Sequence, residues 1–173
     1  LLDRAGEGPL PDSEPAFVDG AVEVHAVAGV LRDARTLRDA VTSLLETVPS
    51  EGYLAIMAYL DRVGDAAAAR LRAALATRLG GPVTFGWGPR FLHSTGQYHK
   101  GGPRNGTFLQ VTGAVDEDVE VPGRPFTLGR LQLAQALGDL DALARRDRPA
   151  VRLHLRDRAE GMRQLLAVAE GAA

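Results

Sequence analysis

Two kinds of hydrophobic pattern follow one another along the chain, and each indicates a different secondary structure. Continuous or alternating apolar residues predict strands at residues 22–26, 53–60, 83–87, 107–112 and 151–155. Apolar residues at helical spacing predict helices over residues 33–48, 65–79, 128–143 and 159–169. Because strands and helices alternate, the pattern is typical of an α/β protein: a three-layer sandwich with a mainly parallel sheet flanked by helices.

The apolar content of the strands also indicates their places in the sheet. Residues 53–60, 83–87 and 107–112 are apolar on both faces, as expected of central parallel strands that helices cover on each side. The segment 151–155 alternates between apolar and polar residues, which favours a place at the sheet edge. An antiparallel meander would contradict this arrangement.

The first 20 residues differ in composition from the rest of the chain. They are rich in proline and acidic residues and show little periodicity, so residues 1–20 are expected to be a linker or the tail of an upstream domain. Residues 21–173 are then expected to form one α/β domain, since 173 residues is a single-domain length.

The composition argues against several classes of function. The net charge is −2 and the arginines are interleaved with acidic residues, so neither nucleic acid nor a membrane is expected as a partner. The chain has no cysteine and no His-x-x-x-His pair, so we expect no disulfide and no metal site. No apolar run approaches the roughly 18 residues of a membrane helix, and we expect a cytoplasmic protein.

The segment from residue 85 to residue 106 is the least interchangeable part of the sequence. It is rich in glycine and contains the only lysine, Lys100, the only tryptophan, Trp87, and the histidines His93 and His99. Glycine lets backbone amides approach a ligand closely. The segment follows strand 83–87, and ligands of open α/β sheets bind outside the carboxyl ends of strands. Motif and architecture therefore point to the same place.

Three side chains of this segment could carry chemistry. If residues 91–99 form a helical turn, His93 and Gln97 share a face at spacing i, i+4, and Lys100 lies one turn further on. His93 can exchange a proton near neutral pH. Gln97 can hydrogen-bond to a sugar hydroxyl, and Lys100 can pair with phosphate or stabilise a developing oxyanion. We take His93 and Lys100 as candidate catalytic residues and Gln97 as substrate-binding.

Other residues of the segment complete the candidate site. Thr95 offers a hydroxyl, Gly96 an unhindered amide and Arg90 a phosphate contact, and all three are candidate substrate-binding residues. The structural alternatives stay open: His93 could cap local backbone groups, Arg90 could be an ordinary surface arginine, and His99 could be a packed structural residue.

The whole segment resembles a known motif. Residues 91–111, FLHSTGQYHKGGPRNGTFLQV, are similar to the LHSxGQ segment of bacterial glucose-6-phosphate isomerases. The similarity is greatest to the version in transaldolase/glucose-6-phosphate isomerase fusion proteins, GPRxLHSTGQxHKGGPxxGxFLQ. Residues 52–60, 126–131 and 134–143 support it, so that the resemblance covers nearly the whole chain.

The resemblance implies the second of two sugar-isomerase (SIS) domains, with flavodoxin-like topology. Such enzymes interconvert glucose 6-phosphate and fructose 6-phosphate through a cis-enediol, without metal or organic cofactor. The family histidine that assists opening of the sugar ring falls on His93; in the family it reaches into the active site of a neighbouring subunit. The implied partners are therefore a sugar phosphate, an upstream SIS domain, in fusion members a transaldolase domain, and a second copy in a homodimer.

Two departures from the family pattern limit what the chain can do. The glutamate that moves the proton between C2 and C1 would lie before Leu1, and the phosphate-binding serine/threonine loop belongs to the same upstream half. The lysine that most members carry in the final helix has no counterpart at residues 155–165, and Lys100 could replace it. The chain alone is expected to be inactive. The alternatives are a non-catalytic SIS-like phosphosugar-binding module and an α/β interaction domain without a ligand.

Overall fold

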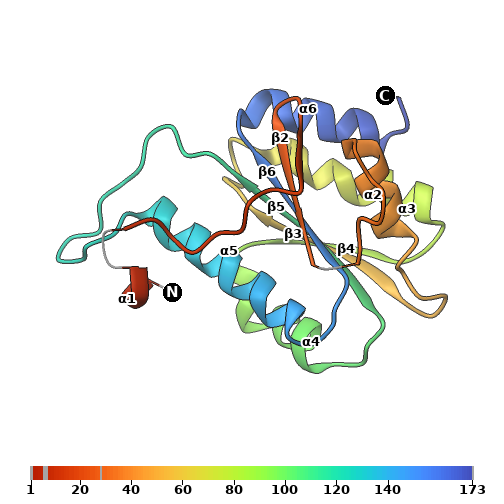
Figure 1. The fold of residues 1–173 in the computed structure, drawn as a ribbon, viewed down its shortest axis with the longest axis horizontal. Helices are drawn as coiled ribbons and strands as arrows, with labels where there is room; N and C mark the ends of the chain where they lie inside the picture. The colour runs from red at the N-terminus through yellow and green to blue at the C-terminus, as the bar shows by residue number, and fades with distance from the viewer. Residues whose placement is uncertain (1, 6–7, 28, 173) are drawn as a thin grey trace.

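The computed structural model describes residues 2–5, 8–27 and 29–172; residues 1, 6, 7, 28 and 173 lie outside that description. The chain folds into three layers, in which helices cover both faces of a six-stranded sheet (Figure 1). The strand order is β1-β2-β6-β5-β3-β4, with bounds Phe17–Asp19, Val22–Ala26, Ala150–Leu155, Gly106–Gly113, Tyr53–Tyr59 and Val83–Trp87. The α/β sandwich with a mainly parallel sheet is therefore confirmed.

Four neighbouring strands of the sheet are parallel. β4, β3, β5 and β6 run in one direction, whereas β2 is antiparallel to β6 and β1 is antiparallel to β2. The chain passes from β3 outward to β4, returns across β3 to β5 and continues to β6, which is the order of flavodoxin-like sheets. The winding therefore reverses between β3 and β5, where such folds hold ligands at the carboxyl ends of the strands.

The structure corrects two predicted strand positions. β4, expected in the centre, is an edge strand of the described sheet and is only partly buried. β6, expected at the edge, lies between β2 and β5. Its polar residues are tolerated there because they have partners: Arg152 is 1% exposed and donates to Asp12 at 2.5 Å, and His154 Nδ1 lies 2.9 Å from the Thr112 hydroxyl. The alternating pattern of β6 thus reflects a paired polar layer instead of contact with solvent.

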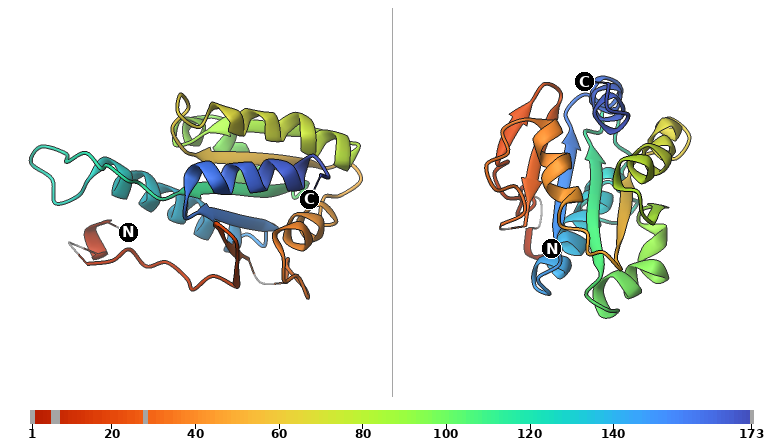
Figure 2. Two further views of the ribbon diagram at one scale, coloured as in Figure 1. Left: turned by 90° about the horizontal axis from the view of Figure 1, so that it is seen from above. Right: turned by 90° about the vertical axis from the view of Figure 1, so that its right-hand side faces the viewer.

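The helices divide between the two faces of the sheet (Figure 2). α2 (Leu37–Leu45), α3 (Arg70–Leu79) and α6 (Arg158–Ala169) cover one face, and α4 (Thr95–Gly101) and α5 (Leu128–Ala144) cover the other. The short helix α1 (Leu2–Ala5) and the 3₁₀ turns η1 (Ala66–Ala69) and η2 (Arg90–His93) complete the described helical elements.

Local signals set the starts and ends of the helices on the first face. α2 is shorter than expected because Thr36 accepts the N–H of Asp39 while the Asp39 carboxylate accepts the N–H of Thr36, a capping box. The 3₁₀ turn η1 occupies the first part of the segment 65–79, and α3 begins only at Arg70. α3 ends at Gly80, whose φ of +65° suits a residue without a Cβ.

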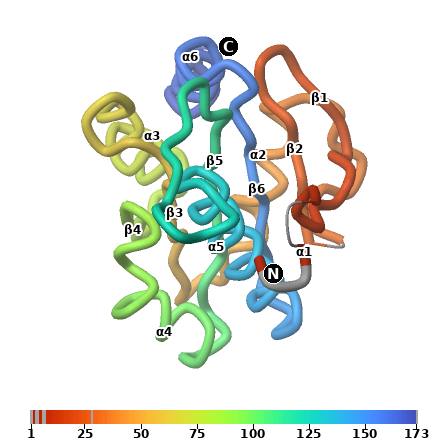
Figure 3. The backbone as a smooth tube through the Cα atoms, turned by 90° about the vertical axis from the view of Figure 1, so that its left-hand side faces the viewer, coloured from red at the N-terminus to blue at the C-terminus, as the bar shows by residue number. Residues whose placement is uncertain are grey.

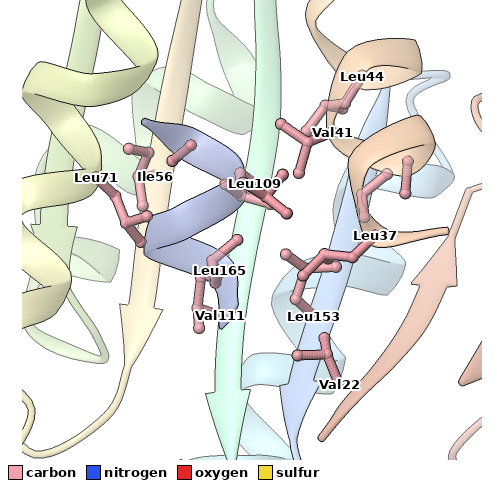
Figure 4. Close-up of a cluster of buried hydrophobic side chains, with 14 of the residues drawn as sticks. Val22, Leu37, Val41, Leu44, Ile56, Leu71, Leu109, Val111, Leu153 and Leu165 are labelled. Carbon is pink, nitrogen blue, oxygen red and sulfur yellow. The ribbon is translucent and has the colours of Figure 1, made fainter. Parts of the chain in front are cut away.

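The main apolar core lies between the sheet and the layer of α2, α3 and α6 (Figure 4). Leu37 and Val41 of α2 and Leu165 of α6 pack in one cluster with the central strand residues Leu109 and Leu153. A smaller core on the other face lies beneath α5 and η2. Its members come from β3, η2, β5, α5 and β6: Ala55, Met57, Tyr59, Phe91, Phe108, Ala136, Leu143 and Ala150.

Part of the amino-terminal segment belongs to the sheet. Residues 17–19, which the composition assigned to the tail, form β1, and the N–H of Ala16 donates to Val24 at 2.8 Å. β1 lies at the opposite side of the molecule from β4 and α4 (Figure 3). The edge that carries the Gly-rich motif is therefore remote from the antiparallel edge.

Candidate functional site

A pocket of about 530 Å³ opens at the carboxyl ends of β3 and β4. The chain segments that line it are the residues directly after β3, the end of β4, and the turn formed by η2 and the start of α4. The lining residues are Leu60, Asp61, Arg62, Phe85, Gly86, Trp87, Gly88, Arg90, Phe91, Ser94 and Thr95. The pocket therefore lies at the carboxyl edge of the parallel strands, where the Gly-rich motif predicted a site, but beside β4 and not at the reversal between β3 and β5.

The motif forms two short helical pieces instead of one continuous turn. η2 ends at His93, α4 begins at Thr95, and Ser94 between them has φ −136° and ψ −101°. His93 and Gln97 consequently do not belong to a single regular helix, although both side chains are exposed. The segment is helical, as predicted, but in two pieces. The i, i+4 spacing assumed for His93 and Gln97 therefore does not apply across the break at Ser94.

Aromatic packing fixes this turn against the sheet. Phe91 is 5% exposed, and its ring meets that of Tyr59 at 5.5 Å in an edge-on arrangement. Glycines make room for the contact: a Cβ on Gly88 would lie 2.7 Å from the Tyr59 ring, and one on Gly86 would lie 3.2 Å from the Phe91 ring. The far end of the motif is held by Arg148, which donates to two carbonyl groups of the segment after α4 at 2.5 Å.

The predicted substrate-binding residues occupy different positions around the pocket. Arg90 and Thr95 line it, and both are exposed. Gly96 is buried, and a Cβ there would lie 3.1 Å from the carbonyl oxygen of Phe91, so its glycine serves packing. The Gln97 amide donates to the Leu92 carbonyl at 2.9 Å and braces the turn while remaining exposed.

The two candidate catalytic residues have opposite surroundings. His93 is exposed at the end of η2, so its imidazole is accessible from outside the domain. Lys100 instead lies against α5, where its ammonium group donates to Asp139 at 2.9 Å. The side chain of Asp139 is only 3% exposed and that of Lys100 19%. The pair gives the only lysine a structural partner, and a catalytic role for Lys100 remains a prediction.

Two functional-looking residues escaped the sequence analysis. Arg62 lines the pocket because it follows β3, and the same rule that placed the motif after β4 also covers this position. Asp139 is a buried acid on the apolar side of α5. Its position among leucines in the sequence could have indicated that it is buried. Its ion-pair partner, Lys100, lies 39 positions away, and the local sequence around neither residue indicates the pairing.

A second pocket, of about 480 Å³, lies at the carboxyl ends of β5 and β6. His154, Asp12 and the start of α5 line it, beside the loop that leaves β5. Asp118 closes the helix start by accepting hydrogen bonds from the N–H of Gly129 at 2.7 Å and from the hydroxyl of Thr127. Arg130 also lines this pocket and donates to the Gly8 carbonyl. Asp118 already accepts at the helix start, so groups of the chain itself use donors that an anion in this pocket would need.

Three histidines are built into the interior. His25 and His99 are buried and His154 is half-buried; burial is the largest factor that lowers the pKa of each. The ring of His99 packs against that of Phe108 at 5.1 Å, so the structural interpretation of His99 fits its position. These side chains favour the neutral form in the folded state.

Acid is therefore expected to destabilise the protein from near-neutral pH downward. The unfolded chain takes up protons on these histidines as the pH falls through about 6.5, whereas the folded chain resists, so the free energy of unfolding should fall between pH 7 and pH 5. Urea unfolding across this range measures it. His99→Phe keeps an aromatic ring and removes one titrating group, so its stability should vary less steeply with pH; an unchanged slope would contradict the expectation.

None of the described helices combines the length and the apolar character that a membrane span requires. Within residues 2–5, 8–27 and 29–172, no group of three or more His, Asp or Glu side chains is arranged to hold a metal ion.

The fold and the pocket define a three-layer α/β protein with a candidate ligand site at the carboxyl edge of its parallel strands. No protein-family model and no curated protein matches the sequence. Nine solved chains match it, among them a hypothetical protein from Thermus thermophilus with a TM-score of 0.65 and 21% identity. The match covers 79% of this chain and 39% of the Thermus chain, so this chain spans well under half of that protein's length. At this identity the likeness shows the fold alone.

Proposed function

We propose that this chain is the carboxyl-terminal SIS domain of a cytoplasmic glucose-6-phosphate isomerase and that it supplies the ring-opening histidine, His93. The observation that carries the proposal is the LHSTGQ segment at residues 92–97. It resembles the family motif letter by letter and lies on the exposed turn beside the pocket at the carboxyl ends of β3 and β4. The substrate class is therefore a hexose 6-phosphate.

The surroundings of His93 support a role in which its side chain reaches a substrate bound outside this domain. Phe91 and Gly96 on either side of it are buried, while His93, Ser94 and Thr95 are exposed. The turn is thus anchored from beneath and presents its polar side chains outward. An imidazole can both accept and donate a proton, and it can therefore move the proton between the ring oxygen and the anomeric hydroxyl during ring opening. The glutamate for the enediol step would come from the upstream domain.

Activity assays on two forms of the protein test the proposal. A longer product that includes the coding sequence upstream of residue 1 is expected to interconvert glucose 6-phosphate and fructose 6-phosphate. The 173-residue chain alone is expected to show negligible turnover, because the missing general base contributes about 10²–10⁴-fold. Full turnover by the chain alone, or none by the longer product, would contradict the proposal.

The alternative is a non-catalytic SIS-like module that binds a phosphosugar. The basic rim of the pocket, with Arg62 and Arg90, favours this second candidate as far as binding is concerned. Sugar-phosphate binding by the longer product without any isomerisation would favour the module over the enzyme.

A further inference from the structure

The pocket beside the motif carries positive charge from two separate parts of the chain. Arg62 follows β3 and Arg90 begins η2, so the fold brings together two guanidinium groups that lie 28 positions apart in sequence. Both side chains are exposed, and neither forms a salt bridge with another residue of the described ranges. Each can therefore turn its planar donor fork toward an anion in the pocket.

The one acidic side chain among the described lining residues is Asp61, and it serves its own loop. The Asp61 carboxylate accepts the N–H of Val63 at 2.8 Å. Backbone N–H groups of Val63 and Gly64 are the main cause of the lowered pKa of Asp61. Two arginines thus face one carboxylate whose hydrogen-bonding capacity is partly used within its turn. The balance at the rim favours a ligand with negative charge.

The remaining walls differ in character from the rim. Phe85 and Trp87 line the pocket from β4, with ring centroids 5.0 Å apart and planes nearly perpendicular. The turn adds two residues with hydroxyl groups, of which Ser94 donates to the Phe91 carbonyl at 3.4 Å and Thr95 is exposed. Apolar walls with a few convergent polar groups are usual for small-molecule sites, and about 530 Å³ lies within their usual range of size.

We propose that this pocket binds a small phosphate monoester, with its phosphate held by Arg62 and Arg90 and its organic part against Phe85 and Trp87. Two guanidinium groups and the Thr95 hydroxyl offer more donors than one carboxylate uses, and a phosphate dianion has three acceptor oxygens to receive them. This anion site belongs to the present chain and is additional to the phosphate loop that the resemblance assigns to the upstream domain. It does not require that the protein isomerise anything.

Fluorescence titration of the 173-residue chain tests the site directly. Trp87 is the only tryptophan, so its emission reports on the pocket without a label. Glucose 6-phosphate, inorganic phosphate and glucose serve as probes at low ionic strength, and calorimetry gives the affinities independently. We expect glucose 6-phosphate to bind more tightly than inorganic phosphate and glucose to produce no signal. Equal affinity for the two phosphates would overturn the assignment of the organic part to the aromatic wall.

Matched arginine variants locate the phosphate contact. Arg62→Gln and Arg90→Gln are each expected to weaken glucose 6-phosphate binding by about tenfold or more, because each removes a charge-assisted contact. Arg72→Gln makes the same charge change on the exposed face of α3, outside the pocket, and should leave the affinity within about twofold. Circular dichroism confirms that each variant is folded.

Several outcomes would overturn the proposal: no phosphate binding at millimolar concentrations, equal losses in the Arg72 control, or unchanged affinity in both pocket variants. These outcomes are independent of the isomerase proposal, because no step of the titration depends on turnover. A catalytically inactive longer protein would leave the anion site standing, and failure of the titration would leave the role of His93 open.

Discussion

In the longer protein proposed to be an isomerase, His93→Ala is expected to lower turnover of the cyclic sugar by roughly 10²-fold or more. Ring opening moves a proton between the ring oxygen and the anomeric hydroxyl, and the exposed imidazole of His93 is the group proposed to do so. The reaction of a substrate that is already open-chain should be affected much less, since the enediol step depends on the glutamate. Steady-state kinetics with cyclic and open-chain substrates, compared for wild type and variant, measures the difference.

A control in the adjoining helix α4 separates catalysis from positioning. Tyr98 is 51% exposed, belongs to α4 and has its ring 6.2 Å from that of Tyr53, so Tyr98→Ala changes an exposed aromatic of the same motif without touching the proposed proton transfer. It is expected to leave the ratio of the two rates unchanged. Equal losses on cyclic and open-chain substrates for His93→Ala would mean that the histidine serves positioning or folding, and the ring-opening role would have to be given up.

The hydrophobic pattern predicted which segments are strands and helices but not how the strands are ordered. β3 and β5 were placed correctly in the centre, because continuous apolar runs need cover on both faces. The alternation in β6 was taken as a sign of solvent, whereas Asp12, 140 positions away, satisfies Arg152 within the fold. A pairing over that separation has no local signature. β4 is apolar yet lies at the edge, where η2 and the pocket adjoin it.

The location of the candidate site could be predicted from the sequence, but its detailed geometry could not. The rule that ligands bind at the carboxyl ends of parallel strands located the pocket, and Arg90 and Thr95 of the motif do line it. The spacing argument failed at Ser94, because residue counting cannot show that a helical turn breaks there. Arg62 reaches the pocket only through strand order, and the ion pair of Lys100 only through the packing of α4 on α5.

Lys100→Met is expected to lower the free energy of unfolding by about 3–5 kcal/mol, because it leaves the Asp139 carboxylate buried without its partner. Asp139→Asn should cost less, since the side chain of Lys100 is 19% exposed and its ammonium group can reach water. Urea unfolding gives both values from the midpoint and the slope. The decisive result is that Lys100→Met loses more free energy of unfolding than Asp139→Asn. In a fully exposed ion pair, both substitutions would cause similar small losses.

The double variant Lys100→Met/Asp139→Asn completes the cycle and should recover much of the loss caused by Lys100→Met alone, because the unpaired charge is then gone. A loss below about 1 kcal/mol for Lys100→Met would show that the pair contributes as little as a surface salt bridge. In that case the ion pair with Asp139 would not explain why the chain keeps its only lysine. A large asymmetric loss would instead make Lys100 the residue that fixes α4 on α5, and with it the turn that presents His93.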